Sequence, residues 1–269
     1  MRSLIIACFA LLLGLSQSAR ADVALLVHGY LGSAASWEFS GINRVLADNG
    51  WQPAGPIVPG PNGPLLPPPM AKAAKKAYTI ELPSTAPLMV QSDIVLAALR
   101  AIRQRDPNEK ITLVGHSAGG VVARLALVRG GAQGVTRLIT IASPNLGTER
   151  ALQALDATHS GGPFGILKDV VGGGDYHAVK DSWPVLVDLS PAVPGSVLFW
   201  LNGQPHPSIE YVSIMRAAPF GLGDQLVPGF SQDMNNVPAL RGKVRDYVVP
   251  ASHALTAADG TMLATLMRN

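Results

Sequence analysis

The sequence predicts an α/β fold: a mostly parallel central sheet with helices on both faces and an inserted cap or lid. Short apolar runs rich in β-branched residues alternate with segments of helical periodicity through the first half of the chain. One of these runs, at 111–114, passes directly through a glycine-flanked turn into a helix. From about 148 to 207 the alternation stops and glycines and prolines recur, which indicates a functional insertion.

The first 21 residues are typical of a secretory signal peptide. Arg2 supplies the positive start, residues 4–15 are apolar, and Ala19 and Ala21 form a small-residue cleavage site. The apolar run is too short to cross a bilayer, so no transmembrane segment is expected. We therefore expect cleavage after Ala21, export to the periplasm or the medium, and one α/β domain over 22–269.

Charge and cysteine content exclude several classes of function. The 21 basic residues exceed the 18 acidic ones, but Arg2 and Arg20 leave with the signal peptide, and the remaining excess is a single charge. A nucleic-acid partner is therefore not expected. Cys8 is the single cysteine and lies in the same peptide, so disulfides and thiol chemistry are not expected either.

The elements expected before the insertion follow the strand–helix–strand order of parallel sheets. Strands are expected at 23–27, 78–82, 111–114 and 135–141, and helices at 37–49, from Pro87 to about 106, and at 121–128. Ser36 is the expected N-cap of the first helix, and Val90, Ile94, Ala98 and Ile102 share one face of the second. Residues 53–69 are rich in Pro and Gly, which predicts a long surface loop.

After the insertion the α/β pattern resumes. Strands are expected at 211–215 and 246–249, and a closing helix at 257–267. Parallel sheets place their sites at the carboxyl ends of their strands. His28, Ser117 and Ser143 all follow such ends.

The turn at Gly115–Gly119 reads Gly-His-Ser-Ala-Gly. A serine between a strand and a helix is held in a strained backbone conformation, and the turn is so tight that side chains at 115 and 119 would clash. The following helix aims its first N–H groups at any anion that forms nearby. Ser117 is therefore the candidate nucleophile.

The first strand runs into His28-Gly29-Tyr30, a loop that can approach a nucleophile closely because of its glycine. The main-chain N–H of Tyr30 is a candidate donor to an oxyanion. A serine hydroxyl also needs a histidine to take its proton and a carboxylate to orient that histidine.

Ser117, Asp224 and His253 stand in the chain order that this arrangement requires, with the acid and the base in loops after late strands. Asp233 and Asp246 are rivals for the acid. The remaining histidines are weaker candidates for the base because of where they lie: His28 in the loop after the first strand, His116 in the turn beside Ser117, and His159, His177 and His206 in the insertion.

Several segments together resemble the bacterial secreted lipases of the α/β-hydrolase superfamily, and they span most of the chain after residue 21. They are 115–120, His28-Gly29, 143–147, 224–228 and His253. The resemblance implies an α/β-hydrolase fold, hydrolysis of carboxylic esters, particularly acylglycerols, and the N–H groups of Tyr30 and Ala118 as the oxyanion hole.

Some of these lipases bind calcium through an aspartate close after the catalytic histidine. Here Ala254-Leu255-Thr256 follows His253, so neither a metal nor a cofactor is expected. The expected partner is a lipid or ester substrate, with transient contact to a lipid interface. The sequence leaves open the acyl length, the oligomeric state and three different functions: a phospholipase or acyltransferase with the same residues, a peptidase, or a non-catalytic lipid-binding or assembly protein.

Overall fold

The computed structural model describes residues 22–70, 75–159, 181–218 and 221–268. The expected signal peptide and residues 160–180 of the expected insertion lie outside these residues. The fold observed is the predicted α/β-hydrolase fold.

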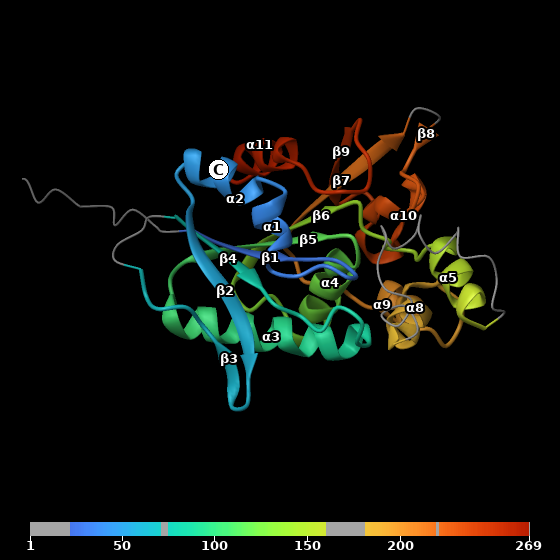
Figure 1. Cartoon of the computed structure of the whole chain (residues 1–269), viewed down its shortest axis with the longest axis horizontal. Coiled ribbons are helices and arrows are strands. Elements are labelled where there is room, and N and C mark those ends of the chain that lie inside the picture. The colour runs from blue at the N-terminus through green and yellow to red at the C-terminus, as the bar shows by residue number, and fades with distance from the viewer. Residues whose placement is uncertain (1–21, 71–74, 160–180, 219–220, 269) are drawn as a thin grey trace, which may run out of the picture.

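Apolar strands form a sheet through the middle of the molecule (Figure 1). The strand order is β3-β2-β4-β1-β5-β6-β7-β8, with β9 beside β7. Within the described residues, β3 and β8 are the antiparallel additions to an otherwise parallel sheet. The strands are β1 Asp22–Val27, β2 Gln52–Gly60, β3 Gly63–Leu65, β4 Lys75–Ile80, β5 Lys110–His116, β6 Val135–Ile141, β7 Glu210–Ala218, β8 Gly221–Leu222 and β9 Val244–Val249.

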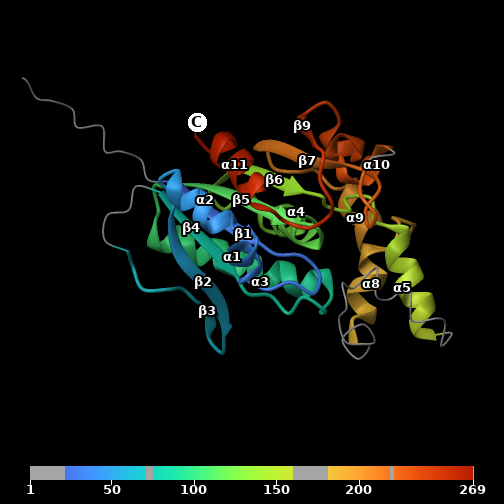
Figure 2. The same ribbon diagram turned by 45° about the horizontal axis from the view of Figure 1, so that its top comes forward.

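Helices cover both faces of the sheet. In Figure 1, α3 and α4 lie on one face and α2 and α11 on the other, while α5, α8 and α9 stand beyond one end of it. Figure 2 shows α5 and α8 side by side at that end. The helices are α1 Ser36–Phe39, α2 Ile42–Asp48, α3 Leu88–Arg105, α4 Ala118–Gly130, α5 Glu149–His159, α8 Trp183–Leu189, α9 Val197–Gly203, α10 Gly229–Gln232 and α11 Ala257–Leu266, with 3-10 turns at Met234–Asn236 and Pro238–Leu240.

The alternation of side chains along each strand divides the core into two layers. Leu25 of β1 packs in the layer that contains α3 and α4, and its neighbour Leu26 packs in the layer that contains α2 and α11. Full burial of one such side chain stabilises the fold by roughly 1.5–3 kcal/mol. A parallel sheet covered on both faces therefore needs the nearly continuous apolar strands that the sequence contains.

The prediction of a surface loop at 53–69 is wrong. Residues 52–60 form β2, which pairs in parallel with β4 through a register shift between Pro53 and Gly55. Because β3 pairs only with the last three residues of β2, most of β2 has a single sheet neighbour. Proline lacks an N–H and is tolerated at such an edge and at a bulge.

Two details of the predicted helices also differ. The helix expected at 37–49 is broken into α1 and α2 by Gly41, whose φ of 78° is left-handed, and Ala35 rather than Ser36 stands at its N-cap. On α3, Val90 is 45% exposed, so it does not lie on the core face expected for it. The buried face of α3 is instead centred on Val95, Leu99 and Ile102.

The part of the insertion that is described is helical. It contains α5, α8 and α9, and the buried side chains of these helices join the core layer of α3 and α4. No helix in the described part of the chain is long and apolar enough to cross a membrane.

Candidate active site

Ser117 lies in a strained turn between β5 and α4. Its φ of 52° and ψ of −129° form the left-handed backbone expected for it, and its N–H donates to the carbonyl of Ile141 at 2.8 Å. A Cβ on Gly115 would lie 2.4 Å from the Cα of Gly120, and one on Gly119 would lie 2.3 Å from the carbonyl oxygen of His28. The steric reason predicted for both glycines is thus confirmed.

The loop after β1 approaches Ser117 closely. A Cβ on Gly29 would lie 2.8 Å from the Cβ of Ser117, which is closer than side chains pack. Two bonds hold the loop against the segment after β4: the N–H of Leu82 donates to His28 Nε2 at 3.1 Å, and the N–H of Ala34 donates to Glu81 at 2.9 Å. His28 therefore has to be neutral at Nε2.

Burial, the larger effect, lowers the pKa of His28, although the Gly29 carbonyl and the charge of Glu81 act in the opposite direction. Within the described residues, neither the N–H of Tyr30 nor that of Ala118 has an acceptor. Both amides flank Ser117, one on the adjacent loop and one at the first position of α4. They are thus available to a third group.

Ser117, His253 and Asp224 form a continuous chain of hydrogen bonds. The Ser117 hydroxyl donates to His253 Nε2 at 2.9 Å, and His253 Nδ1–H donates to Asp224 Oδ2 at 3.0 Å. Ser117 follows β5, Asp224 follows β7 and His253 follows β9. The parallel sheet therefore brings His253 within hydrogen-bond distance of Ser117, 136 positions earlier, and of Asp224, 29 positions earlier. The structure therefore assembles the three residues that chain order selected.

Asp224 is held as an ionised carboxylate. Its side chain is 0% exposed, and burial alone would raise its pKa. Hydrogen bonds and the charge of His253, with N–H bonds from Leu226 at 2.8 Å and Val227 at 2.9 Å, outweigh burial and lower that pKa. A carboxylate in this state can fix the histidine tautomer that leaves Nε2 free to accept a proton.

The family model described as "alpha/beta hydrolase fold" matches residues 23–166 of the chain, more than half of its length. This chain is an α/β-hydrolase. No curated protein matches it in sequence.

Solved structures share the fold of this α/β-hydrolase at low sequence identity. The lipase BlEst2 of Bacillus licheniformis in its mature form is 18% identical with a TM-score of 0.63, over 93% of this chain and 91% of that one. The product of gene lin2722 from Listeria innocua is 14% identical with a TM-score of 0.62, over 93% and 95%. A lipase-esterase related protein from Clostridium acetobutylicum is 11% identical with a TM-score of 0.55, over 94% and 96%.

The rival acids of the hydrolase lie away from His253. Asp233 accepts the N–H of Asn235 at 2.7 Å, and Asp246, in β9, accepts from the side chain of the same asparagine at 2.6 Å. Neither forms a hydrogen bond with the base. Their bonds give both residues a structural role in the turn before β9.

A small apolar cavity lies beside Ser117 and His253. Its volume is about 60 Å³. Its apolar walls come from the loops after β1 and β6, from helices α5 and α8, and from the segment after Asp224: Tyr30, Pro144, Ala151, Leu186, Leu189, Leu226 and Val227. An adjoining groove of about 420 Å³ shares Thr148, Arg150 and Leu226 with it and has a more polar lining.

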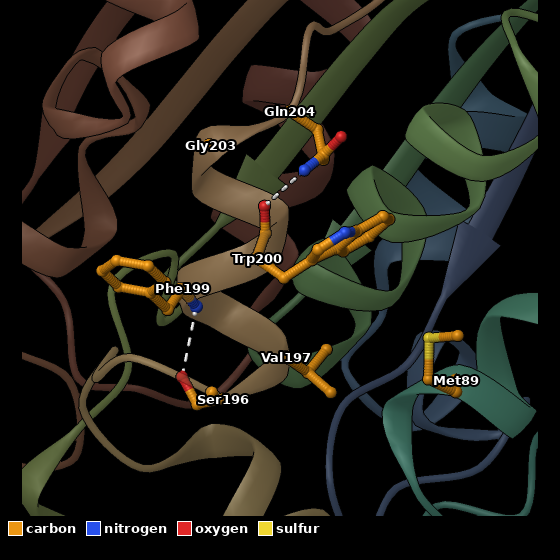
Figure 3. A pocket seen from close by; sticks show the side chains of 8 residues that line it. Met89, Ser196, Val197, Phe199, Trp200, Gly203 and Gln204 are labelled. Atoms are coloured by element: carbon orange, nitrogen blue, oxygen red, sulfur yellow. Dashed lines mark hydrogen bonds between the residues drawn. The ribbon is translucent and has the colours of Figure 1, made fainter.

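A larger cavity of the hydrolase lies elsewhere. Its volume is about 620 Å³, and it lies between α9 and Met89 of α3, with Phe199 and Trp200 on its wall (Figure 3). It shares no lining residue with the cavity beside Ser117. The relay of Ser117, His253 and Asp224 therefore opens into the smaller space.

Two further features bear on the site. Within the described residues, no group of three or more His, Cys, Asp or Glu is placed to hold a metal ion.

Sequence reasoning did not find His116, Arg216, Gln232 and Asp259 as neighbours of the relay. An arginine inside the otherwise uncharged run 211–218 was the available signal, since a buried charge requires a partner.

Proposed function

We propose that this α/β-hydrolase is a serine carboxylic-ester hydrolase, exported by its signal peptide, that acts on acylglycerols as a lipase. The observation that carries the proposal is the unbroken chain of hydrogen bonds from Asp224 through His253 to Ser117. A binding protein has no need of a serine in a strained backbone that is hydrogen-bonded to a histidine. Strain of this kind costs roughly 1–3 kcal/mol and recurs at active sites.

The chemistry follows from the roles that these groups can take. His253 accepts the proton of Ser117 while the hydroxyl oxygen attacks the ester carbonyl. The N–H groups of Tyr30 and Ala118 donate to the oxyanion that forms, and Asp224 stabilises the positive charge on His253. Protonated His253 then gives its proton to the departing alcohol, and water activated by the same histidine cleaves the acyl-enzyme.

Apolar surface at the site and on the helices of the insertion supports a lipid substrate. The cavity beside Ser117 is lined largely by aliphatic side chains. Trp183 of α8 and Phe199 of α9 are about half exposed on the cap helices. Exposed apolar groups on this scale are typical of a surface that meets another apolar body.

A short-chain carboxylesterase is the second candidate, and the size of the cavity favours it. A space of about 60 Å³ holds only a few carbon atoms. A lipase would therefore place most of a long acyl chain in the adjoining groove of about 420 Å³. Acyl-length preference separates the two candidates.

The test is hydrolysis of p-nitrophenyl esters from acetate to palmitate by the protein and by a Ser117→Ala variant, with labelling by a fluorophosphonate. Activity that rises with acyl length and is absent from the variant supports a lipase. A maximum at acetate or butyrate supports the short-chain esterase. Activity in the variant would refute Ser117 as nucleophile.

Two remaining outcomes would indicate a function other than simple ester hydrolysis. Fluorophosphonate labelling of Ser117 without hydrolysis of any simple ester would favour a phospholipase, an acyltransferase or a peptidase. Each of these three is then assayed with a phospholipid, with an added alcohol acceptor or with a peptide. Absence of both labelling and hydrolysis would favour a non-catalytic lipid-binding protein.

A further inference from the structure

Arg216 lies at the end of β7, next to the loops that carry the acid and the base. Its side chain is 0% exposed, and the strand around it is apolar. An arginine in such a position is costly because its charge has left water. Its contacts indicate what it contributes.

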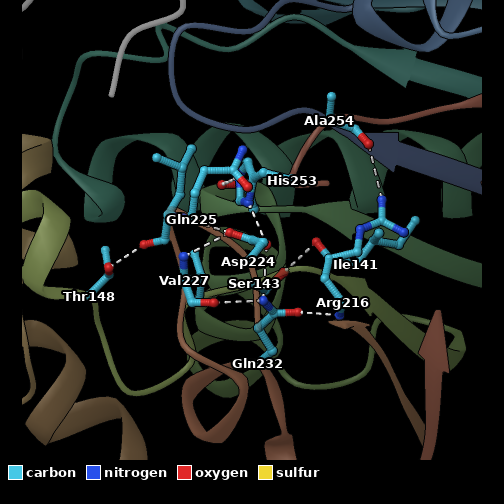
Figure 4. A network of polar contacts seen from close by, with 12 residues as sticks. Ile141, Ser143, Thr148, Arg216, Asp224, Gln225, Val227, Gln232, His253 and Ala254 are labelled. Carbon is cyan, nitrogen blue, oxygen red and sulfur yellow. Dashed lines mark hydrogen bonds and ion pairs between the residues drawn. The ribbon is translucent and has the colours of Figure 1, made fainter. Parts of the chain in front are cut away.

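The side chain of Arg216 joins three parts of the chain. Its guanidinium binds the carboxylate of Asp259 through two bonds, of 2.7 and 3.0 Å. Nη2–H also donates to the carbonyl of Ala254, with 3.3 Å between the two atoms, and this contact is drawn in Figure 4. Asp259 also accepts the N–H of Thr256 at 2.8 Å and so forms part of the N-terminal cap of α11. The ion pair thus holds the residue directly after His253 against β7 and α11.

The backbone of Arg216 holds the acid through a second residue. Its N–H donates to Gln232 Oε1 at 2.8 Å, and Gln232 Nε2–H donates to Asp224 Oδ2 at 3.0 Å and to the carbonyl of Val227 at 2.8 Å. Gln232 is 1% exposed, so these partners replace water completely. Figure 4 shows the connection from Arg216 through Gln232 to Asp224 and His253.

We infer that Arg216 is a positioning residue that sets Asp224 and His253 relative to each other. Its side chain anchors the loop of the base, and its main chain anchors the loop of the acid. The inference rests on the proposed function, because it assigns a role to residues that act through the relay. Removal of the Arg216 side chain would release the segment after His253, and removal of the Gln232 side chain would release Asp224, while Ser117 stays in place.

The energetics favour positioning over stabilisation. A buried ion pair adds little to stability compared with apolar residues of the same volume, because desolvation offsets the attraction. The two bonds to Asp259 fix the plane of the Arg216 guanidinium, and the guanidinium in turn fixes the direction of the Ala254 carbonyl that it binds. Displacement of a catalytic group by about 1 Å can cost on the order of 100-fold in rate.

The experiment compares Arg216→Met, Arg216→Lys and Gln232→Met with Lys76→Met. Lys76 forms a largely buried ion pair with Asp106 at 2.7 Å, but it lies at the start of β4, the opposite end of the sheet from Ser117. The variants are assayed for Tm, for kcat and KM with p-nitrophenyl butyrate, and for hydrogen exchange of peptides that cover 224–232 and 250–256.

The expected result is a kcat at least about tenfold lower in Arg216→Met and Gln232→Met, with KM within about twofold of the parent. Arg216→Lys keeps the charge but lacks the planar fork, so its kcat falls between those of the parent and Arg216→Met. Exchange in the 250–256 peptide rises in Arg216→Met, which loses the side-chain bonds to Asp259 and Ala254. Exchange in the 224–232 peptide rises in Gln232→Met, because the Arg216 variants keep the main-chain N–H that binds Gln232. Lys76→Met loses a similar amount of Tm and keeps its kcat.

Several outcomes overturn the inference. Unchanged kcat in Arg216→Met and Gln232→Met would do so, as would a kcat loss in Lys76→Met of the same size. If Arg216→Met does not fold, the kcat values of Arg216→Lys and Gln232→Met test the inference in its place. If the parent protein neither hydrolyses esters nor reacts with the phosphonate, the proposed function fails, and hydrogen exchange alone decides the anchoring role of Arg216.

Discussion

The Nε2–H of His116 donates to the carbonyl oxygen of His253, with 2.9 Å between the nitrogen and the oxygen. The turn that carries Ser117 therefore also holds the backbone of His253, the proposed base. The two rings are tilted by 48° with centroids 5.1 Å apart. Burial first, and then the charge of His253, lowers the pKa of His116 to about 3.

His116 is expected to weaken the fold in acid. Its pKa is lowered from about 6.5, so below that pH the unfolded chain binds a proton that the folded chain does not accept until about pH 3. The free energy of unfolding then falls by about 1.4 kcal/mol per pH unit from this residue alone. His116→Gln should lose about 2–3 kcal/mol less than the parent between pH 7.5 and 4.5.

Urea denaturation at the two pH values measures this difference. Both proteins are neutral at position 116 at pH 7.5, so the comparison there reports only the loss of the imidazole and its contacts. Equal losses of stability in acid would contradict the lowered pKa.

Asp224→Asn should inactivate the enzyme without unfolding it. The amide oxygen can still accept the N–H groups of Leu226 and Val227, but it carries no charge to stabilise protonated His253. A fall in kcat on the order of 10³–10⁴-fold is expected, as for the corresponding change in a serine protease. Asp233→Asn and Asp246→Asn are the matched controls and should keep the parent kcat. If one of these controls loses activity while Asp224→Asn stays active, the residue changed in that control is the acid instead of Asp224.

Gly119→Ala should disrupt the elbow through one methyl group. The added Cβ would lie 2.3 Å from the carbonyl of His28 and 2.5 Å from that of Val27, and neither backbone atom can move without shifting β1 or the loop that follows it. Overpacking of this kind costs about 1–3 kcal/mol or more, which lowers Tm by several degrees. Gly203→Ala has no atom within 4 Å of the new Cβ and should leave Tm and kcat nearly unchanged. Equal Tm values for Gly119→Ala and Gly203→Ala would contradict the steric argument.

Leu189→Ala should change the acyl preference of the enzyme. Leu189 is buried and lines the cavity of about 60 Å³ beside Ser117. Its truncation makes room for several carbon atoms, so kcat/KM for the hexanoate ester should rise about tenfold relative to the acetate ester. Leu198→Ala, a buried leucine outside that cavity, controls for general loosening of the core. An unchanged ratio would place the acyl chain elsewhere.

The strands and the elbow could be predicted from the sequence because their causes are local. A run such as 135–141 is apolar at nearly every position, which suits a strand covered on both faces. Gly115 and Gly119 flank a serine whose backbone only a tight turn produces. The chain order of Ser117, Asp224 and His253 then follows from the order of the strands.

Predictions from local sequence were wrong where the structure of a segment depends on the elements that pack against it. Proline content predicted a loop at 53–69, but an edge position beside β4 accepts prolines in a strand. Periodicity placed Val90 on the core face of α3, but the core covers a slightly different part of that helix. Both errors depend on what packs against the segment.

The sequence by itself determined the fold class and selected Ser117 and His253, with Asp224 as one of three candidate acids. Only the tertiary structure decided that Asp224 rather than Asp233 or Asp246 contacts the base, and that Arg216 pairs with Asp259 43 positions later. Periodicity and backbone preference act over a few neighbouring residues and can be derived from a single chain. Hydrogen bonds between distant side chains form only when the packed sheet and helices bring the donors within about 3 Å of their acceptors.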